Sequence, residues 1–258
     1  KSHNIVAGNW IGIDNTGVTG LPNDFGIFID SAPNNLVGTN GDGAGDAQER
    51  NIISGNTKQG VYITNSPADG NIIAGNYIGL NPEGNAALKN GNGSNGYGIY
   101  VLNAPNTLIG TDSDGVANST ERNVISGNHV GGVMIMGKDA AGTIITGNRI
   151  GTDASGTAAI PNGSGIPGSG VILSECSDAR VGSNGDGLHD AAERNLISGN
   201  TGYGIHVLEG SGDRLIAGNY IGIKDSGGGT LGNSQDGILL QGAYGVTIGG
   251  TLPALKNT

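Results

Sequence analysis

The sequence contains few of the side chains from which ordinary globular enzymes build a core and a solvated helical shell. Aromatic residues make up 4% of its 258 positions and charged residues 13%, and both shares are low for a compact domain. The single cysteine, Cys176, excludes an internal disulfide bond. No apolar run approaches the length of a membrane-spanning helix. The fold must therefore be held by backbone hydrogen bonds and by the stacking of similar segments.

Positive charge is also scarce, and the formal net charge is −10. An acidic surface repels phosphate groups, so nucleic acid and anionic membrane surfaces are not expected as partners. Acidic loops instead suit cations.

Glycine, with 52 residues, is abundant, and the chain repeats itself. The motif Arg-Asn-x-Ile-Ser-Gly-Asn, with a valine or leucine at x in two copies, begins at Arg50, Arg122 and Arg194, in steps of 72 residues. A second motif, Gly-Asn-x-Ile-Gly, begins at Gly8, Gly75, Gly147 and Gly218. A fixed period of this kind is typical of solenoid proteins.

The apolar residues alternate over short runs bounded by glycine, asparagine and aspartate, which indicates strands and no helix. Each repeat fits two coils of three strands, as in residues 71–101 and 107–135. We therefore expect an all-β fold, a right-handed parallel β-helix of about seven coils. We expect it to form a single domain over 1–258 and to be a segment of a longer repeat array. The inward positions expected to stack are Ile73, Ile78, Ile99, Ile109, Ile125 and Ile135.

These motifs resemble those of parallel β-helix repeat proteins of the pectin-lyase-like superfamily, in particular the repeat arrays of large bacterial surface or secreted proteins. The resemblance covers essentially the whole chain and implies the β-helix fold. It does not decide the activity, because the superfamily includes polysaccharide lyases, hydrolases, epimerases, tailspikes and adhesins.

Three loops have the same spacing of oxygen-bearing side chains, at relative steps of 0, 2, 6 and 9, with glycine directly after the second. This spacing resembles the EF-hand calcium loop from its third position to its last, although the first ligand and the flanking helices are missing. The alternative is a plain Asp-Gly turn followed by a Glu-Arg pair. The candidate Ca²⁺ ligands are Asn40, Asp42, Asp46, Glu49, Asp112, Asp114, Asn118, Glu121, Asn184, Asp186, Asp190 and Glu193.

One apolar or aromatic residue per coil is expected to point outward from the third strands. This interaction stripe consists of Phe28, Tyr62, Tyr100, Met134, Ile172, His206 and Leu239. An exposed stripe would be a surface for lateral protein association or for sugars, and the alternative is that a loop covers it. A sparser aromatic series could stack on sugar rings or reflect strand propensity alone, and consists of Trp10, Tyr77 and Tyr220.

The outward strand positions offer no pair of carboxylates for acid–base chemistry on sugars. We therefore expect a non-catalytic structural or adhesive segment, extracellular or on the cell surface, with calcium-stabilised loops. Its partners would be further copies, end to end or side by side, or neighbouring repeats of the same polypeptide. The alternative is a polysaccharide-active enzyme or a glycan-binding module.

Overall fold

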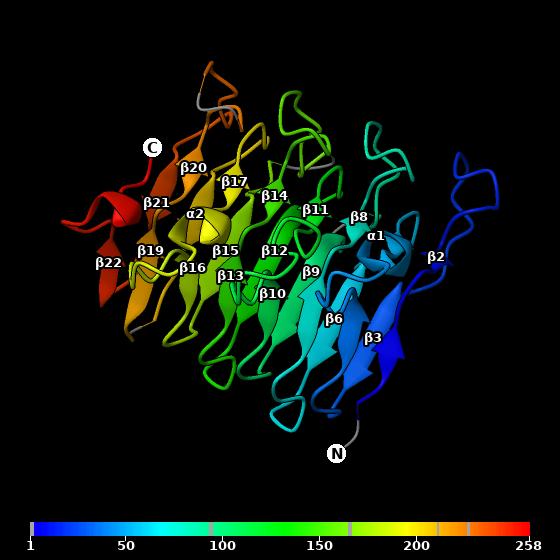
Figure 1. Ribbon diagram of the computed structural model, residues 1–258, viewed down its shortest axis with the longest axis horizontal. Helices are drawn as coiled ribbons and strands as arrows, with labels where there is room; N and C mark the ends of the chain where they lie inside the picture. The colour runs from blue at the N-terminus through cyan, green and yellow to red at the C-terminus, as the bar shows by residue number, and fades with distance from the viewer. Residues whose placement is uncertain (1–2, 93–94, 165–166, 211, 226–227) are drawn as a thin grey trace.

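The computed structural model describes residues 3–92, 95–164, 167–210, 212–225 and 228–258. The chain winds through three sheets in turn, so that strands far apart in sequence lie side by side along a rod (Figure 1). Every pair of neighbouring strands in the sheets is parallel. The right-handed parallel β-helix expected from the repeat is confirmed.

The first sheet contains β1 (Ile5–Val6), β4 (Leu36–Gly38), β7 (Ile72–Ala74), β10 (Leu108–Gly110), β13 (Ile144–Thr146), β16 (Arg180–Gly182), β19 (Arg214–Ala217) and β22 (Val246–Ile248). The second sheet contains β2 (Trp10–Ile11), β5 (Ile52–Ile53), β8 (Tyr77–Ile78), β11 (Val124–Ile125), β14 (Arg149–Ile150), β17 (Leu196–Ile197) and β20 (Tyr220–Ile221). The third sheet contains β3 (Ile27–Asp30), β6 (Val61–Thr64), β9 (Tyr97–Leu102), β12 (Gly131–Met136), β15 (Val171–Ser174), β18 (Ile205–Val207) and β21 (Ile238–Leu240).

The core is a stack of aliphatic side chains, with one from most strands of the first and second sheets and two from most strands of the third, such as Ile99 and Val101. Ile73 pairs in register with Ile109, and Ile78 pairs with Ile125. All six isoleucines expected to point inward are fully buried. Full burial of such a side chain contributes roughly 1.5–3 kcal/mol, so the stacked coils share a core that no single coil could form.

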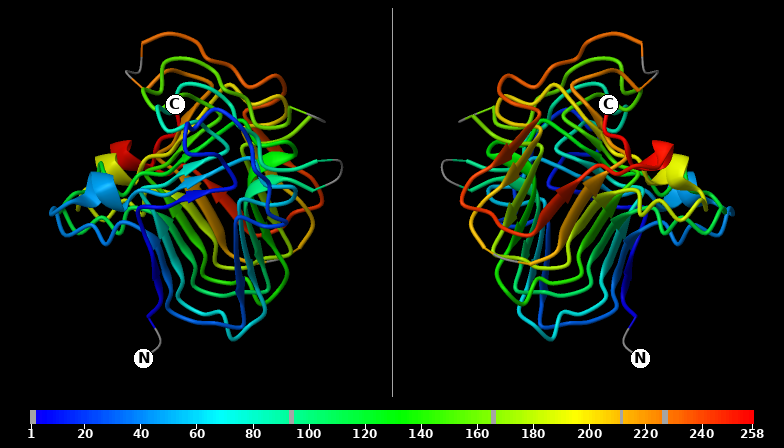
Figure 2. Two further views of the ribbon diagram at one scale, coloured as in Figure 1. Left: turned by 90° about the vertical axis from the view of Figure 1, so that its right-hand side faces the viewer. Right: turned by 90° about the vertical axis from the view of Figure 1, so that its left-hand side faces the viewer.

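Two kinds of coil alternate along the rod. In one, the first and second sheets are joined by a tight Gly-Asn turn such as Gly75–Asn76. In the next they are joined by a longer segment, and we call these three segments, 39–51, 111–123 and 183–195, the flank loops. The flank loops lie above one another on one side of the rod, as the end views show (Figure 2). The 72-residue period is the sum of one coil of each kind.

The structure corrects the expectation that the chain contains no helix. Single helical turns, α1 (Asp46–Glu49) and α2 (Asp190–Glu193), lie in the first and third flank loops, and a 3-10 turn, η1 (Pro253–Leu255), lies near the last coil. Gly45 and His189 precede α1 and α2 with φ of 85° and 56°. A left-handed residue lets the chain reverse direction into the helical turn that follows. A helix of four residues is too short to show a periodic apolar pattern in the sequence.

Asparagine side chains form ladders of hydrogen bonds that run parallel to the core. In the longest, each amide donates to the side-chain oxygen in the next coil, as from Asn76 to Asn123 at 3.0 Å and from Asn123 to Asn148 at 2.9 Å. The same amides also donate to backbone carbonyls, as Asn123 does to Ile73. The ladder consists of Asn9, Asn51, Asn76, Asn123, Asn148, Asn195, Asn219 and Asn257.

A second ladder occupies the corner between the second and third sheets. It consists of Asn23, Asn56, Asn90, Asn128, Asn162, Asn200 and Asn233. At the turns between sheets, backbone polar groups have no neighbouring strand to bond to, and the two ladders supply their hydrogen-bond partners. The ladders also hold each coil in one register with the next.

Replacing Asn123 with alanine should lower the free energy of unfolding by about 2–4 kcal/mol, because the buried backbone N–H and side-chain amide of Asn76 would lose their acceptor. Urea denaturation measures the loss. Asn15→Ala, at an exposed loop position, is the control and should change stability by less than about 0.5 kcal/mol. Equal effects of the two substitutions would contradict the structural role of the ladder.

Candidate functional site

The candidate calcium ligands lie in the flank loops, where their oxygens accept hydrogen bonds from the loops themselves. In the first loop, the side chain of Asn40 accepts from the Asp42 N–H at 3.1 Å, and Asp42 accepts from the Ala44 N–H at 2.8 Å. Glu49 accepts from the Asn40 N–H at 3.0 Å. The third loop repeats this pattern with Asn184, Asp186, Leu188 and Glu193. This is the hydrogen bonding of an Asp-Gly turn.

The acidic residue at the start of each helical turn bonds to a hydroxyl at the end of the preceding strand. Asp46 accepts from Thr39 at 3.0 Å and from Thr120 of the next flank loop at 2.9 Å. Asp190 accepts from Ser183 at 2.8 Å. These bonds tie each loop to its own coil and, at Thr120, the first loop to the second.

The second flank loop carries Asp112, Asp114, Asn118 and Glu121, of which Asn118 accepts from the Gly115 N–H at 3.2 Å. Within the described ranges, no three His, Cys, Asp or Glu side chains are grouped to hold one metal ion. Calcium binding by the flank loops stays a prediction.

Glu121 differs from Glu193 because it forms no ion pair with any residue that the structure describes. Glu193 is 3% exposed and forms an ion pair with Arg180 at 2.7 Å. Glu121 is 4% exposed and accepts a hydrogen bond from Thr111 at 2.7 Å. Burial raises the pKa of the Glu121 carboxyl to about 7, although the Thr111 hydroxyl lowers it, and the nearby Asp112 raises it further.

The interaction stripe forms one column in register along the outer face of the third sheet, as expected. Its accessibility is uneven: Phe28 is 51% exposed, whereas Met134 and Ile172 are buried. The Tyr100 hydroxyl donates to the Met136 sulfur at 3.2 Å, which places this ring beside the buried part. A continuous exposed stripe is therefore wrong for the middle of the column, where Met134 and Ile172 are buried.

The exposed end of the stripe is a stack of aromatic rings. The rings of Phe28 and Tyr62 lie 5.2 Å apart and 9° from parallel, and Tyr62 and Tyr100 are also 5.2 Å apart. Phe25, which precedes the third sheet, stacks on Phe28 and Tyr62, and Lys58 lies 4.8 Å from its ring centroid. We call Phe25, Phe28, Tyr62 and Tyr100 the aromatic ladder.

The sparser aromatic series lies on the outer face of the second sheet, and the protein's own arginines cover part of it. Arg50 lies over the Tyr77 ring at 4.3 Å, and Arg194 lies over Tyr220 at 5.4 Å. Trp10 remains 47% exposed. Of the three rings proposed for sugar stacking, Trp10 is thus the most accessible.

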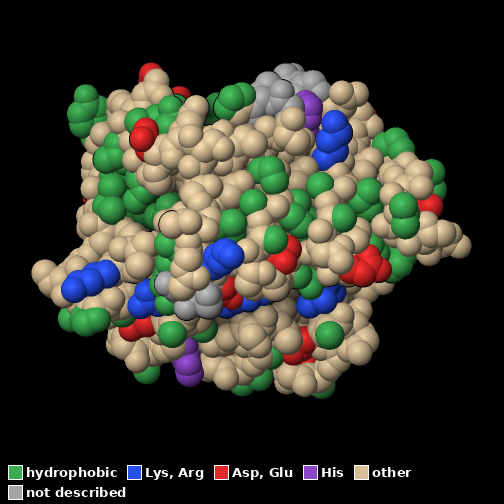
Figure 3. Space-filling model, turned by 90° about the horizontal axis from the view of Figure 1, so that it is seen from above, with side chains coloured by type: hydrophobic (Ala, Val, Ile, Leu, Met, Phe, Trp, Pro, Cys, Tyr) green, Lys and Arg blue, Asp and Glu red, His purple; other side chains and the backbone are tan. Residues whose placement is uncertain are grey.

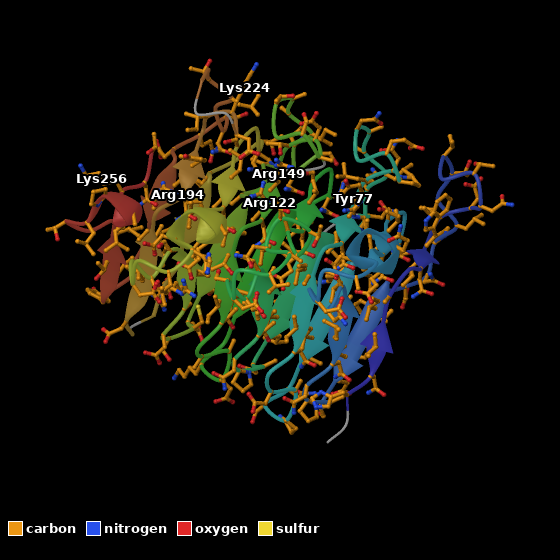
Figure 4. The ribbon with its side chains drawn as sticks, in the orientation of Figure 1. Tyr77, Arg122, Arg149, Arg194, Lys224 and Lys256 are labelled. Carbon is orange, nitrogen blue, oxygen red and sulfur yellow. The ribbon has the colours of Figure 1, made fainter. Side chains whose placement is uncertain are left out.

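Between Tyr77 and Tyr220 along the second sheet, the repeat has Arg149 at the aromatic position. Arg122, which is equivalent to Arg50 and Arg194, lies near Arg149 (Figure 4). Both guanidinium groups pair with Asp225, which neutralises part of this charge. Burial lowers the pKa of Arg122, and Arg149 lowers it further. Acidic and basic side chains are interspersed on the face seen from above (Figure 3), so no patch of one sign forms there.

An apolar column on the outer face of the first sheet was not predicted from the sequence. Ile5, Leu36, Ile72 and Leu108 are in register there, and all four line a cavity of about 380 Å³. The residues two places further along these strands, such as Ala74, are smaller and give no such signal. Aligning the three repeats would have shown Leu36, Leu108 and Arg180 at one position.

A pair of carboxylates was also missed. Glu175 follows β15 directly, Glu209 lies two residues beyond the end of β18, and the Glu175 N–H donates to the Glu209 carbonyl at 2.9 Å. Together with Lys138 they line an open cavity of about 540 Å³ at one edge of the third sheet. Both residues lie in turns, outside the outward strand positions at which the sequence predicts no carboxylate pair.

Comparison with known proteins places the chain in a family. The family model described as "Periplasmic copper-binding protein (NosD)" matches residues 80–226, which is more than half of the chain. The chain belongs to the NosD family.

A search of curated proteins found no match to this NosD-family chain. Among solved structures, it is similar to the periplasmic alginate epimerase AlgG T265N mutant at 16% identity and a TM-score of 0.44. The match covers 86% of this chain and 44% of the epimerase, so the chain spans less than half of that protein.

Copper does not fit the side chains that the structure describes. Thiolate, thioether and imidazole groups are the preferred copper ligands. Cys176 is buried, and burial raises the pKa of its thiol although Arg214 lowers it. The Met136 sulfur accepts from Tyr100. The described His, Cys, Asp and Glu residues form no group of three that could hold a metal ion.

Replacing Glu121 with glutamine should stabilise the protein at pH 8 and leave stability near pH 4 almost unchanged. Its carboxyl has a pKa of about 7 in the folded protein and about 4.3 when unfolded. The folded state thus binds the proton more tightly, and the wild type loses stability as the pH rises from about 4 to about 7. The expected gain at pH 8 is on the order of 1–3 kcal/mol, measured by urea denaturation across this range.

The matched control is Glu193→Gln, which should instead destabilise the protein at pH 8 because Arg180 loses its ion-pair partner. If Glu121→Gln also destabilised the protein at pH 8, the description of Glu121 as an unpaired buried acid would be wrong.

Proposed function

We propose that this chain is a non-catalytic structural and adhesive β-helix segment, and that the aromatic ladder on the third sheet is its adhesive surface. The observation that carries the proposal is the in-register stack of Phe28, Tyr62 and Tyr100 on a rigid sheet, with Phe28 half exposed. Aromatic side chains placed in this way bind partners with little loss of conformational entropy.

The rings of the aromatic ladder are held by backbone pairing and by one another. Phe28 pairs in register with Tyr62, and Tyr62 with Tyr100. A stacked aromatic pair contributes about 0.5–1.5 kcal/mol beyond its buried area. The surface therefore exists before the partner arrives, and a partner need not order it.

A glycan is the partner class that this surface suits best. The apolar faces of successive sugar rings can pack along a continuous strip of aromatic rings, and Lys58 and Asp24 beside Phe25 offer hydrogen bonds to hydroxyl groups. The net charge of −10 favours a neutral or basic glycan over an acidic one.

We also propose a location outside the cytoplasm, in the periplasm or at the cell surface. The description of the family as periplasmic supports it. In the described part of the chain, no helix is both long and apolar enough to cross a membrane. Association with further copies or with neighbouring repeats of the same polypeptide would extend the adhesive surface along the rod.

The double variant Phe28→Ala, Tyr62→Ala should lose at least tenfold in affinity for any glycan that the wild type binds, because the exposed end of the strip disappears. An array of neutral, basic and acidic glycans, followed by binding assays on the hits, measures this. Trp10→Ala is the control for an exposed aromatic residue on a different sheet and should bind normally. Failure of the wild type to bind any glycan, or equal binding by the double variant, would contradict the proposal.

A second candidate function is cleavage of polysaccharides, favoured by Glu175, Glu209 and Lys138 around their open cavity. Two carboxylates flanking a sugar bond are the usual requirement for hydrolysis. Product analysis on the glycans that bind decides between the candidates. Release of shorter chains by the wild type, and not by Glu175→Gln, would replace the adhesive proposal.

Calcium-stabilised flank loops complete the proposal, supported by the repeated spacing of Asn40, Asp42 and Glu49 and their counterparts. Millimolar calcium should raise the melting temperature, because a ligand that binds only the folded state stabilises it by about 2.7 kcal/mol at a hundred times its Kd. Differential scanning calorimetry with calcium, magnesium or EDTA measures this. A melting temperature that is the same in calcium and EDTA would remove calcium from the account.

A further inference from the structure

The outer face of the first sheet carries different residues at one equivalent position of the three repeats. Leu36, Leu108 and Arg180 each begin their strand directly below a flank loop. Only Arg180 carries a charge. The protein therefore contains this position with a cation in the third repeat and without one in the first and second, and of the two unpaired carboxylates only Glu121 is buried, whereas Glu49 is partly exposed.

In the third repeat, the Arg180 side chain fills this position. Its guanidinium donates to the Glu193 carboxylate at 2.7 Å and to the Gly182 carbonyl at 2.9 Å. Its side chain is 19% exposed, so its aliphatic stem is largely covered. The acceptors are thus a buried carboxylate and a backbone carbonyl at the end of the strand.

The second repeat keeps both acceptors and lacks the cation. Gly110 is equivalent to Gly182, and Glu121 is equivalent to Glu193. None of the ion pairs among the described residues includes Glu121. Asp112, where the third repeat has Asn184, adds another carboxylate at the rim.

The space beside these acceptors is an open cavity with an apolar floor. Its volume is about 380 Å³, and Gly110, Asp112 and Glu121 lie along its wall. Its floor consists of Ile5, Leu36, Ile72 and Leu108. Ile5 and Ile72 are 66% and 37% exposed, which leaves apolar surface for a ligand to cover.

We propose that this cavity binds a guanidinium group carried on an aliphatic stem. The guanidinium bonds to the Glu121 carboxylate and the Gly110 carbonyl, as that of Arg180 does with Glu193 and Gly182. The stem lies across Leu108 and Ile72. A planar guanidinium suits a buried carboxylate better than an ammonium does, because its donors form a fixed fork.

Both parts of the ligand are needed for this recognition. A bare cation would leave the apolar floor in water, and an uncharged aliphatic molecule would leave the buried carboxylate without a counter-charge. Each methylene that leaves water for the floor should tighten binding by up to about fourfold. The site does not depend on the adhesive function proposed for the third sheet.

Isothermal titration calorimetry at pH 8 in EDTA tests the proposal with n-butylguanidinium and n-hexylguanidinium. Saturable binding at one site is expected, tighter for the hexyl compound, with guanidinium ion and hexanol at least tenfold weaker. A blocked peptide with one central arginine distinguishes the sources. Tighter binding of the peptide than of the butyl compound assigns the site to a polypeptide arginine, and weaker binding assigns it to a free guanidinium compound.

Two reciprocal variants provide the matched controls. Leu108→Arg copies the third repeat and should fill the cavity, so that binding is lost while the circular dichroism spectrum is unchanged. Arg180→Leu copies the second repeat and should raise the stoichiometry from one site to two. If Leu108→Arg bound n-hexylguanidinium as the wild type does, or if hexanol bound equally well, the proposal would be overturned.

Discussion

Everything in this molecule depends on parallel stacking of coils in a single register. A slip by one residue would turn each buried isoleucine to the surface and each outward side chain into the core. The asparagine ladders oppose such a slip at the turns, since Asn76, Asn123 and Asn148 each bond to the next ladder member and to backbone carbonyls. A buried amide left without its partner costs about 1–3 kcal/mol, so an out-of-register coil is penalised at two corners at once.

Because the register is fixed, equivalent residues of successive coils lie in columns along the surface. The candidate binding side chains belong to these columns. Each sheet carries its own: apolar residues on the first, tyrosine and arginine on the second, and the aromatic ladder on the third. Because a column takes one residue from each coil, a single substitution changes one position without disturbing the rest. Arg180 in place of leucine and Arg149 in place of tyrosine are such changes, and each has its own carboxylate partner, Glu193 or Asp225.

The sequence predicted the fold almost completely, because period and alternation are local properties that survive in a single chain. The inward isoleucines and the register of the interaction stripe follow from them. Burial of Met134 and Ile172 could not be predicted in this way, since it depends on the three-dimensional packing around the column, which period and alternation do not determine. Nor could the environment of Glu121, because the ion pair between Arg180 and Glu193, which the second repeat lacks, becomes visible only when each strand is placed beside its own flank loop.

Hydrogen exchange of the asparagine side chains tests most directly whether buried ladders hold the coils in register. In two-dimensional NMR spectra, the side-chain amide protons of Asn76, Asn123 and Asn148 should exchange orders of magnitude more slowly than those of the exposed Asn15, since opening them requires adjacent coils to separate. Exchange of the ladder amides at the rate of Asn15 would contradict the account, because the ladders would then be surface features that form and break without consequence for the rod.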